Sequence, residues 1–220
     1  KLENSWRGAS KYHGDQGPVR VRPIDSPYLL HEEMMASAAN AGFATTDDLG
    51  GPNPEGFARG EQTVDDRGHR VSAASAYIKP ALGRKNLDVR QNTQVTRVVF
   101  EGKRAIGVEV HTPSGPQLVR ARKEVILSGG PINSVQLLKL SGIGPAEELK
   151  ELGIEVRADR PGVGANLQDH LEFYFQMACT QPITLYGKAN LLGKAMVGAQ
   201  WLLGRKGVGA SNQFESCGFI

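Results

Sequence analysis

The sequence predicts a mixed α/β fold, and three of its features carry that prediction. Residues 87–127 hold short β-branched or alternating runs separated by turn residues, which is typical of an antiparallel meander. Residues 27–41 and 191–203 carry apolar side chains at helical spacing. The apolar run Val125-Ile126-Leu127 leads through Ser128-Gly129-Gly130 towards a further helix, which is how an α/β sheet presents a ligand at the carboxyl ends of its strands.

Turn and cap residues divide the chain into its expected elements. Gly42 ends the first helix, and glycine, proline and acidic residues make residues 47–60 a loop. Pro145 occupies the favoured first turn of a later helix, which Gly153 ends. In chain order the expected elements are an extended run at 19–22, helices at 27–41 and 72–82, strands at 87–89, 94–100, 105–111, 117–122 and 124–127, helices at 134–140 and 145–152, strands at 154–157 and 171–177, and a helix at 191–203.

Composition excludes several classes of protein. The 220 residues are 40% apolar and 22% charged, which is ordinary for a globular protein. The 26 basic and 23 acidic residues are nearly balanced and scattered, which argues against nucleic acid as a partner. Two cysteines without metal-ligand spacing predict neither a disulfide framework nor a metal site, and favour a reducing, cytoplasmic compartment. The apolar segment 191–203 is broken by Lys194 and is too short to cross a bilayer.

Both ends of the chain predict an internal piece of a longer protein. The chain opens on Lys1, with no methionine and no signal-type pattern. It ends on Gly218-Phe219-Ile220, which has the pattern of a strand that is beginning.

Glycine clusters suggest a dinucleotide site but miss its fingerprint. Gly142-Ile143-Gly144, Gly162-Val163-Gly164 and Gly207-Val208-Gly209 each lack the third glycine, and none lies between a strand and a helix as phosphate binding requires. Taken singly they are turns.

The expected strand at 171–177 places His170, Glu172 and Tyr174 on one face. On pattern alone a solvated face is favoured. The alternative is a pocket wall, in which the Glu172 carboxylate and the Tyr174 ring suit a quaternary ammonium cation. The opposite, core-facing side would hold Leu171, Phe173, Phe175 and Met177.

No other residue is expected to act in catalysis. No Gly-x-Ser-x-Gly motif occurs, and Cys217 lies beside Glu215, which disfavours a reactive thiolate. The remaining histidines are expected to be solvated; they are His13, His31, His69 and His111.

Several motifs of the chain occur together in one order. They lie at 14–19, 70–77, 93–100, 130–144, 161–172 and 178–185, and include Gly130-Pro131-Ile132-Asn133-Ser134 and Asn166-Leu167-Gln168-Asp169-His170. These motifs resemble those of the glucose–methanol–choline flavoprotein oxidoreductases, in particular the choline dehydrogenase branch. The resemblance covers nearly the whole chain and departs at Val135, where the family usually has proline.

The resemblance implies a doubly wound FAD-binding domain interleaved with an antiparallel-sheet substrate domain. Residues 68–168 would belong to the FAD-binding domain, 1–67 to a substrate-domain or linking segment, and 169–220 to the substrate domain. The glycine motif for the flavin diphosphate would lie upstream and the catalytic histidine downstream. We therefore expect this chain alone to hold FAD weakly and to be inactive.

The resemblance also implies particular site residues. Val95 would contact the adenine part of FAD, and Ser128 and Gly129 would end a strand that faces the cofactor. Glu172 would face the trimethylammonium group of choline, with His170 beside it.

The implied reaction is oxidation of a primary alcohol, choline to betaine aldehyde on the route to glycine betaine, by hydride transfer to flavin N5. An uncharged primary alcohol as substrate, and a non-catalytic binding module, stay open as alternatives. A nicotinamide-dependent Rossmann enzyme ranks lowest because the meander is antiparallel. The electron acceptor and peripheral association with the inner membrane stay open.

Overall fold

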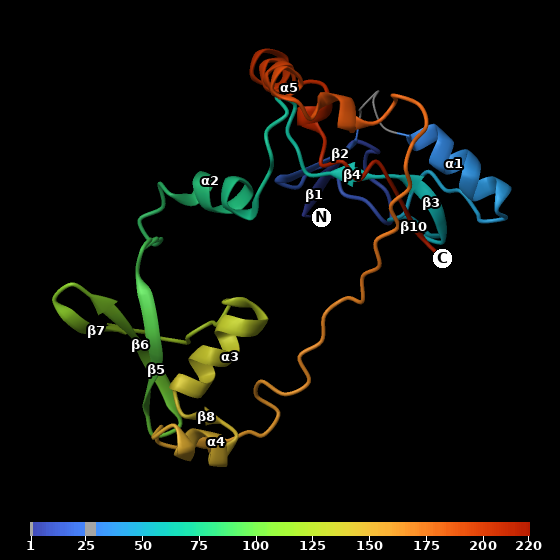
Figure 1. The fold of residues 1–220 in the computed structure, drawn as a ribbon. Coiled ribbons are helices and arrows are strands. Elements are labelled where there is room, and N and C mark those ends of the chain that lie inside the picture. Colours follow the sequence, from blue (N-terminus) through green and yellow to red (C-terminus); the bar gives the residue numbers. More distant parts are fainter. Residues whose placement is uncertain (1, 25–29) are drawn as a thin grey trace. The chain divides into compact units, whose positions relative to one another are not determined.

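The computed structural model describes residues 2–24 and 30–220, and it confirms a mixed α/β fold (Figure 1). The chain divides into two compact units. Unit 1 contains Lys1–Asp88 and Gln176–Ile220, and unit 2 contains Val89–Phe175. Residues 27–29 of the first expected helix lie outside the described residues. The assignment of chain segments to cofactor and substrate domains stays a prediction.

Unit 1 is built from two small sheets and the helices packed on them. One sheet has the order β1-β2-β4, parallel between β1 and β2 and antiparallel between β2 and β4; β10 and β3 form an antiparallel pair. The buried core of unit 1 includes Ile24, Ala38, Ala58 and Val208. The elements are β1 (Glu3–Ser5), β2 (Val19–Pro23), α1 (His31–Asn40), β3 (Gly56–Arg59), β4 (Glu61–Gln62), a π-helical turn (Ala74–Ile78) running into α2 (Lys79–Ala81), a 3-10 turn (Leu185–Lys188), α5 (Leu191–Gly204), a second 3-10 turn (Val208–Ala210) and β10 (Ser216–Phe219).

Two histidines that were expected to be solvated instead contact other side chains of unit 1. His31 is buried at the start of α1, and its Nδ1 lies 2.7 Å from Ser216 Oγ on β10. His13 lies between two carboxylates, with Nδ1 3.1 Å from Glu3 Oε1 and Nε2 2.9 Å from Asp48 Oδ2. The His13 side chain is only 10% exposed. The expectation was wrong because the three partners come from segments far apart in the sequence.

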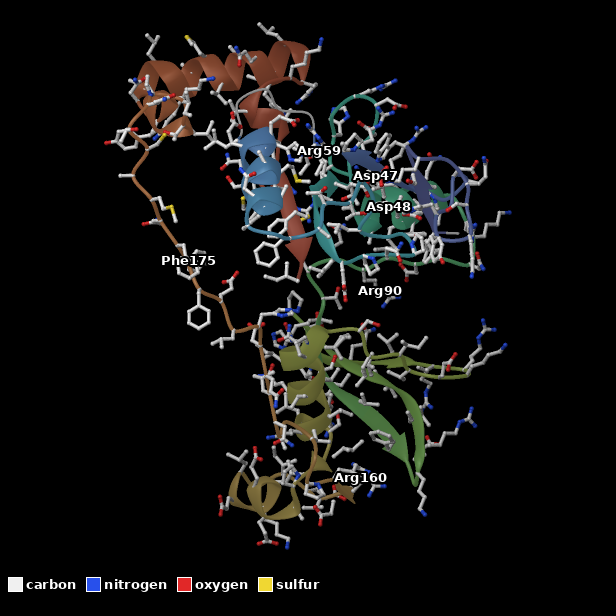
Figure 2. All side chains as sticks on the ribbon, turned by 90° about the vertical axis from the view of Figure 1, so that its right-hand side faces the viewer. Asp47, Asp48, Arg59, Arg90, Arg160 and Phe175 are labelled. Carbon is white, nitrogen blue, oxygen red and sulfur yellow. The ribbon has the colours of Figure 1, made fainter. Side chains whose placement is uncertain are left out.

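His13 joins the segment before β2 to the loop before β3, in which Figure 2 labels Asp48. Both ring nitrogens face acceptor-only carboxylates, and only the imidazolium can donate from both. The hydrogen bond to Asp48 raises the pKa of His13, against the effect of burial, and Glu3 raises it further. Arg7, which pairs with Asp48 and Glu61, is the cation beside this cluster.

The His13 contacts predict that unit 1 loses stability as the pH rises. A histidine whose pKa is raised by folding stabilises the fold fully below its unfolded pKa of about 6.5. That stabilisation disappears as the pH passes through the raised pKa of the folded state. Urea unfolding between about pH 6 and pH 9 should therefore show a falling free energy of unfolding. The fall of the free energy of unfolding with pH should be smaller in His13→Gln. It should stay the same in the control His111→Gln, because His111 is an exposed histidine of unit 2. An unchanged slope in His13→Gln would contradict this assignment.

Unit 2 is an antiparallel meander with two helices, as the strand pattern predicts. The sheet has the order β5-β6-β7, so β5 lies at an edge. Val98 and Val110 are buried in this sheet, and Leu149 is fully buried on α4. The elements are β5 (Gln94–Glu101), β6 (Arg104–Thr112), β7 (Gly115–Arg120), α3 (Gly130–Leu140), β8 (Ile143–Gly144), α4 (Ala146–Glu151) and β9 (Ala158–Asp159), with β8 and β9 parallel.

Four expected strands do not form, at residues 87–89, 124–127, 154–157 and 171–177. The core face expected for 171–177 is open to solvent, because Leu171, Phe173, Phe175 and Met177 are 73–91% exposed. A strand needs neighbours for its backbone N–H and C=O groups. Among the described residues, none of these four segments forms a β-ladder, although Ile154 and Arg157 donate single backbone hydrogen bonds to Leu149 and Gly142.

Candidate functional site

The expected substrate-binding residues lie in an extended, exposed segment. Figure 2 shows Phe175 on this segment, which contains no helix or strand from residue 165 to 179. Tyr174 Oη donates a hydrogen bond of 2.7 Å to Glu172 Oε2. This bond raises the pKa of the Tyr174 hydroxyl, and desolvation adds to the effect. The two side chains therefore lie on one side of the chain, as a spacing of two residues in an extended backbone predicts.

His170 is held through its backbone. Its N–H donates to Asp169 Oδ1 at 2.8 Å, and the residue is exposed. The Glu172–Tyr174 pair is thus a polar cluster made by two side chains, and the His170 ring is not part of that hydrogen bond.

Val95 lies on β5, where the sheet is open. Val98 N–H donates to Ser141 Oγ at 2.8 Å instead of to β6, so the backbone of Val98 faces the free edge. Val98 pairs with Val108 and Val95 pairs with Val110, two residues further along β6. The register shifts between Val95 and Arg97, so three residues of β5 lie opposite two residues of β6. Because the backbone direction of β6 repeats every second residue, Val95, like Val98, turns its N–H and C=O away from β6. An adjacent donor and acceptor on an open edge can bind the edge of a planar heterocycle.

The carbonyl of Val95 has one partner at this edge. Gln94 Nε2 donates to it at 3.2 Å, from an exposed side chain that a ligand could displace.

Ser128 and Gly129 precede α3 in an exposed coil instead of ending a strand. The N–H of Gly129 donates to Ser134 Oγ at 3.1 Å, and Pro131 lies in the first turn of the helix. The helix therefore begins four residues before the expected start at Ser134, because proline suits a first turn. Among the described residues, no hydrogen bond joins Ser128 or Gly129 to Val95.

Ser141 is a structural residue that the sequence analysis missed. Its hydroxyl donates to Leu137 O at 2.6 Å and accepts from Val98 N–H, so the end of α3 is bound to the edge of β5. A serine in the last helical turn is the only sequence signal for this role, since such hydroxyls commonly bond to the carbonyl four residues earlier.

An open, mostly apolar pocket of about 890 Å³ lies between α3 and the loop at 162–168. Gly164 forms its floor with φ +84°, and a Cβ there would lie 3.0 Å from Val135 Cγ1. Lys139 Nζ lies 2.6 Å from Glu148 Oε1 and ties α3 to α4 beside the pocket. The turn at Gly162-Val163-Gly164 becomes part of a pocket only because α3 packs close to it. The sequence pattern does not show this packing.

Within residues 2–24 and 30–220, no group of three or more histidine, cysteine or acidic side chains could hold a metal ion. No helix in the same residues is long and apolar enough to cross a membrane.

Comparisons with known proteins identify the family of this chain. The chain is 49% identical over all 220 residues to an oxygen-dependent choline dehydrogenase of Brucella anthropi, and it spans 40% of the length of that relative. An FAD-dependent oxidoreductase from Chaetomium thermophilum matches 90% of the chain with a TM-score of 0.76 and 29% identity, over 35% of its own chain.

A crystal structure of formate oxidase shares the fold over 100% of this chain and 40% of its own, with a TM-score of 0.81 and 23% identity. The profile described as GMC oxidoreductase matches residues 3–172. Because this match covers most of the sequence, the chain belongs to the GMC oxidoreductase family.

Proposed function

We propose that the complete protein containing this chain oxidises the CH–OH group of a primary alcohol with bound FAD, and that its substrate is choline. The supporting observation is the 49% identity to an oxygen-dependent choline dehydrogenase over every residue of the chain. When bound, FAD supplies the hydride acceptor for such a reaction.

In this proposal Glu172 attracts the trimethylammonium group of choline. Such a group cannot donate a strong hydrogen bond, so a carboxylate and an aromatic face recognise it by charge. The hydrogen bond from Tyr174 supports this role, because it holds the Glu172 carboxylate in one orientation. His170 would lie beside the substrate. We assign no proton transfer to any residue of this chain.

The proposed cofactor contacts are Val95, Ser128 and Gly129. The open backbone edge at Val95 supports the first of them, because it offers an N–H and a C=O side by side to a planar base. Residues 68–168 are proposed as part of the FAD-binding domain, residues 1–67 as a substrate-domain or linking segment, and residues 169–220 as part of the substrate-binding domain. A cytoplasmic location belongs to the same proposal and is supported by two unpaired cysteines, Cys179 and Cys217.

Anaerobic mixing of the complete protein with alcohols tests the proposal. The absorbance of bound flavin should bleach rapidly with choline and far more slowly with 3,3-dimethylbutan-1-ol, which has the same shape without the charge. Rapid bleaching by the neutral alcohol alone would overturn choline as the substrate and keep the family. A purified protein that holds no flavin would overturn the cofactor assignment.

A further inference from the structure

A second cavity, of about 1140 Å³, lies in unit 1 between α5 and the strands β2 and β4. Figure 1 shows α5 next to these strands within the unit. The cavity is open to solvent, and its apolar lining includes Val64 and the exposed side chains Met196 and Leu203. None of its lining residues is among those proposed above to contact choline or FAD.

The charged side chains that line this cavity are all cations: Arg22, Arg205 and Lys206. Asp66 pairs with both Arg22 and Arg20, so one acid is shared between two arginines. Arg205 and Lys206 add two further positive charges, and no described acidic residue lines the cavity with them. The cavity therefore favours a negatively charged ligand.

Arg205 is held in place for such a ligand. It follows the last turn of α5 in a left-handed conformation with φ 52°, and its backbone N–H donates to Trp201 O. The guanidinium carbon lies 3.9 Å from the centroid of a Trp201 ring, which is a stacking contact. Stacking fixes the plane of the guanidinium but gives its N–H groups no acceptor.

One nitrogen of this guanidinium is left unsatisfied. Nη1 of Arg205 is buried and has no hydrogen-bond partner among the described residues. Buried polar groups are almost always hydrogen-bonded, and an unpaired one on a charged group is particularly unfavourable. A ligand in the cavity that offers an acceptor would give this N–H a hydrogen-bond partner.

We propose that the cavity binds a short-chain carboxylate. The planar fork of a guanidinium matches a carboxylate with two parallel hydrogen bonds, and Lys206 adds a second positive charge. The apolar lining of the cavity would cover the hydrocarbon chain of the ligand. On binding, the guanidinium of Arg205 rotates within its own plane, which keeps the stacking contact with Trp201 and turns the unsatisfied N–H towards the carboxylate.

Isothermal titration calorimetry of the complete protein with hexanoate measures this binding. Hexan-1-ol, of equal chain length and without charge, serves as the ligand control. Saturable binding of hexanoate below about 10 mM, with none for hexan-1-ol, is expected for a weak, specific site.

Substitutions then test the assigned contact. Arg205→Gln should weaken hexanoate binding about tenfold or more, because it removes the charge of the bidentate contact. Arg160→Gln, at an exposed arginine of unit 2 labelled in Figure 2, should leave binding unchanged. If Arg205→Gln does not fold, Lys206→Gln on the exposed neighbour provides the second test, with weaker binding of hexanoate again expected.

Four results would overturn the proposal. They are the absence of hexanoate binding, equal binding of hexanoate and hexan-1-ol, binding of inorganic phosphate without hexanoate, and unchanged hexanoate affinity in a folded Arg205→Gln or Lys206→Gln protein.

Discussion

Replacing Glu172 with glutamine is expected to weaken the binding of choline to the complete protein by about two orders of magnitude. The substitution keeps the size of the side chain and its capacity to accept the hydrogen bond from Tyr174, which is 2.7 Å long here. It removes only the charge that faces the trimethylammonium group. Because that cation leaves water on binding, it loses solvation that a nearby negative charge largely replaces.

Two comparisons isolate the effect of charge at Glu172. The affinity for 3,3-dimethylbutan-1-ol should be nearly equal in the wild-type protein and in Glu172→Gln, since that ligand has no charge to lose. Glu151→Gln, at an exposed position of unit 2, should bind choline as the wild-type protein does. The measurement is the dissociation constant from anaerobic titration of flavin absorbance. An unchanged affinity for choline in folded Glu172→Gln would remove Glu172 from the site.

Leu149→Ala is expected to lower the free energy of unfolding of unit 2 by about 2–5 kcal/mol. Leu149 lies on α4 and is 0% exposed. Its Cδ1 lies near Gly144 on β8, and its backbone carbonyl accepts from Ile154 N–H. The side chain thus packs α4 against β8, while the backbone carbonyl connects α4 to the chain that leads to β9. Truncation leaves a cavity that this small unit has few side chains to fill.

Leu152→Ala is the matched control, because it makes the same chemical change three residues later. Leu152 is 66% exposed at the end of α4, so its truncation should change the stability by less than about 0.5 kcal/mol. Urea unfolding followed by circular dichroism measures both variants. Equal losses of stability would show that Leu149 is not the anchor of this helix.

Elements stabilised by local contacts were predicted well. The hairpins of β5, β6 and β7 follow from alternating strands joined by short turns, and α5 runs over Leu191–Gly204 against an expected 191–203. The common side of Glu172 and Tyr174 follows from their spacing alone. These features depend on residues close in sequence, so one sequence contains the information that specifies them.

Elements that depend on distant partners were predicted poorly. The apolar run at 124–127 and the alternating run at 171–177 have the composition of strands, yet both stay unpaired. Likewise, no local pattern showed that His13 would meet Glu3 and Asp48, or that the backbone of Val95 would face an open edge.

The sequence by itself therefore determined most of the helices, the hairpins, the family motifs and the common side of Glu172 and Tyr174. Only the tertiary structure decided which strands have partners, which histidines are buried, and where Arg205 lacks an acceptor. The physical reason is that helices and hairpins form their hydrogen bonds between residues close in sequence. Strand pairing, burial and charge compensation require groups that the chain brings together only when it folds.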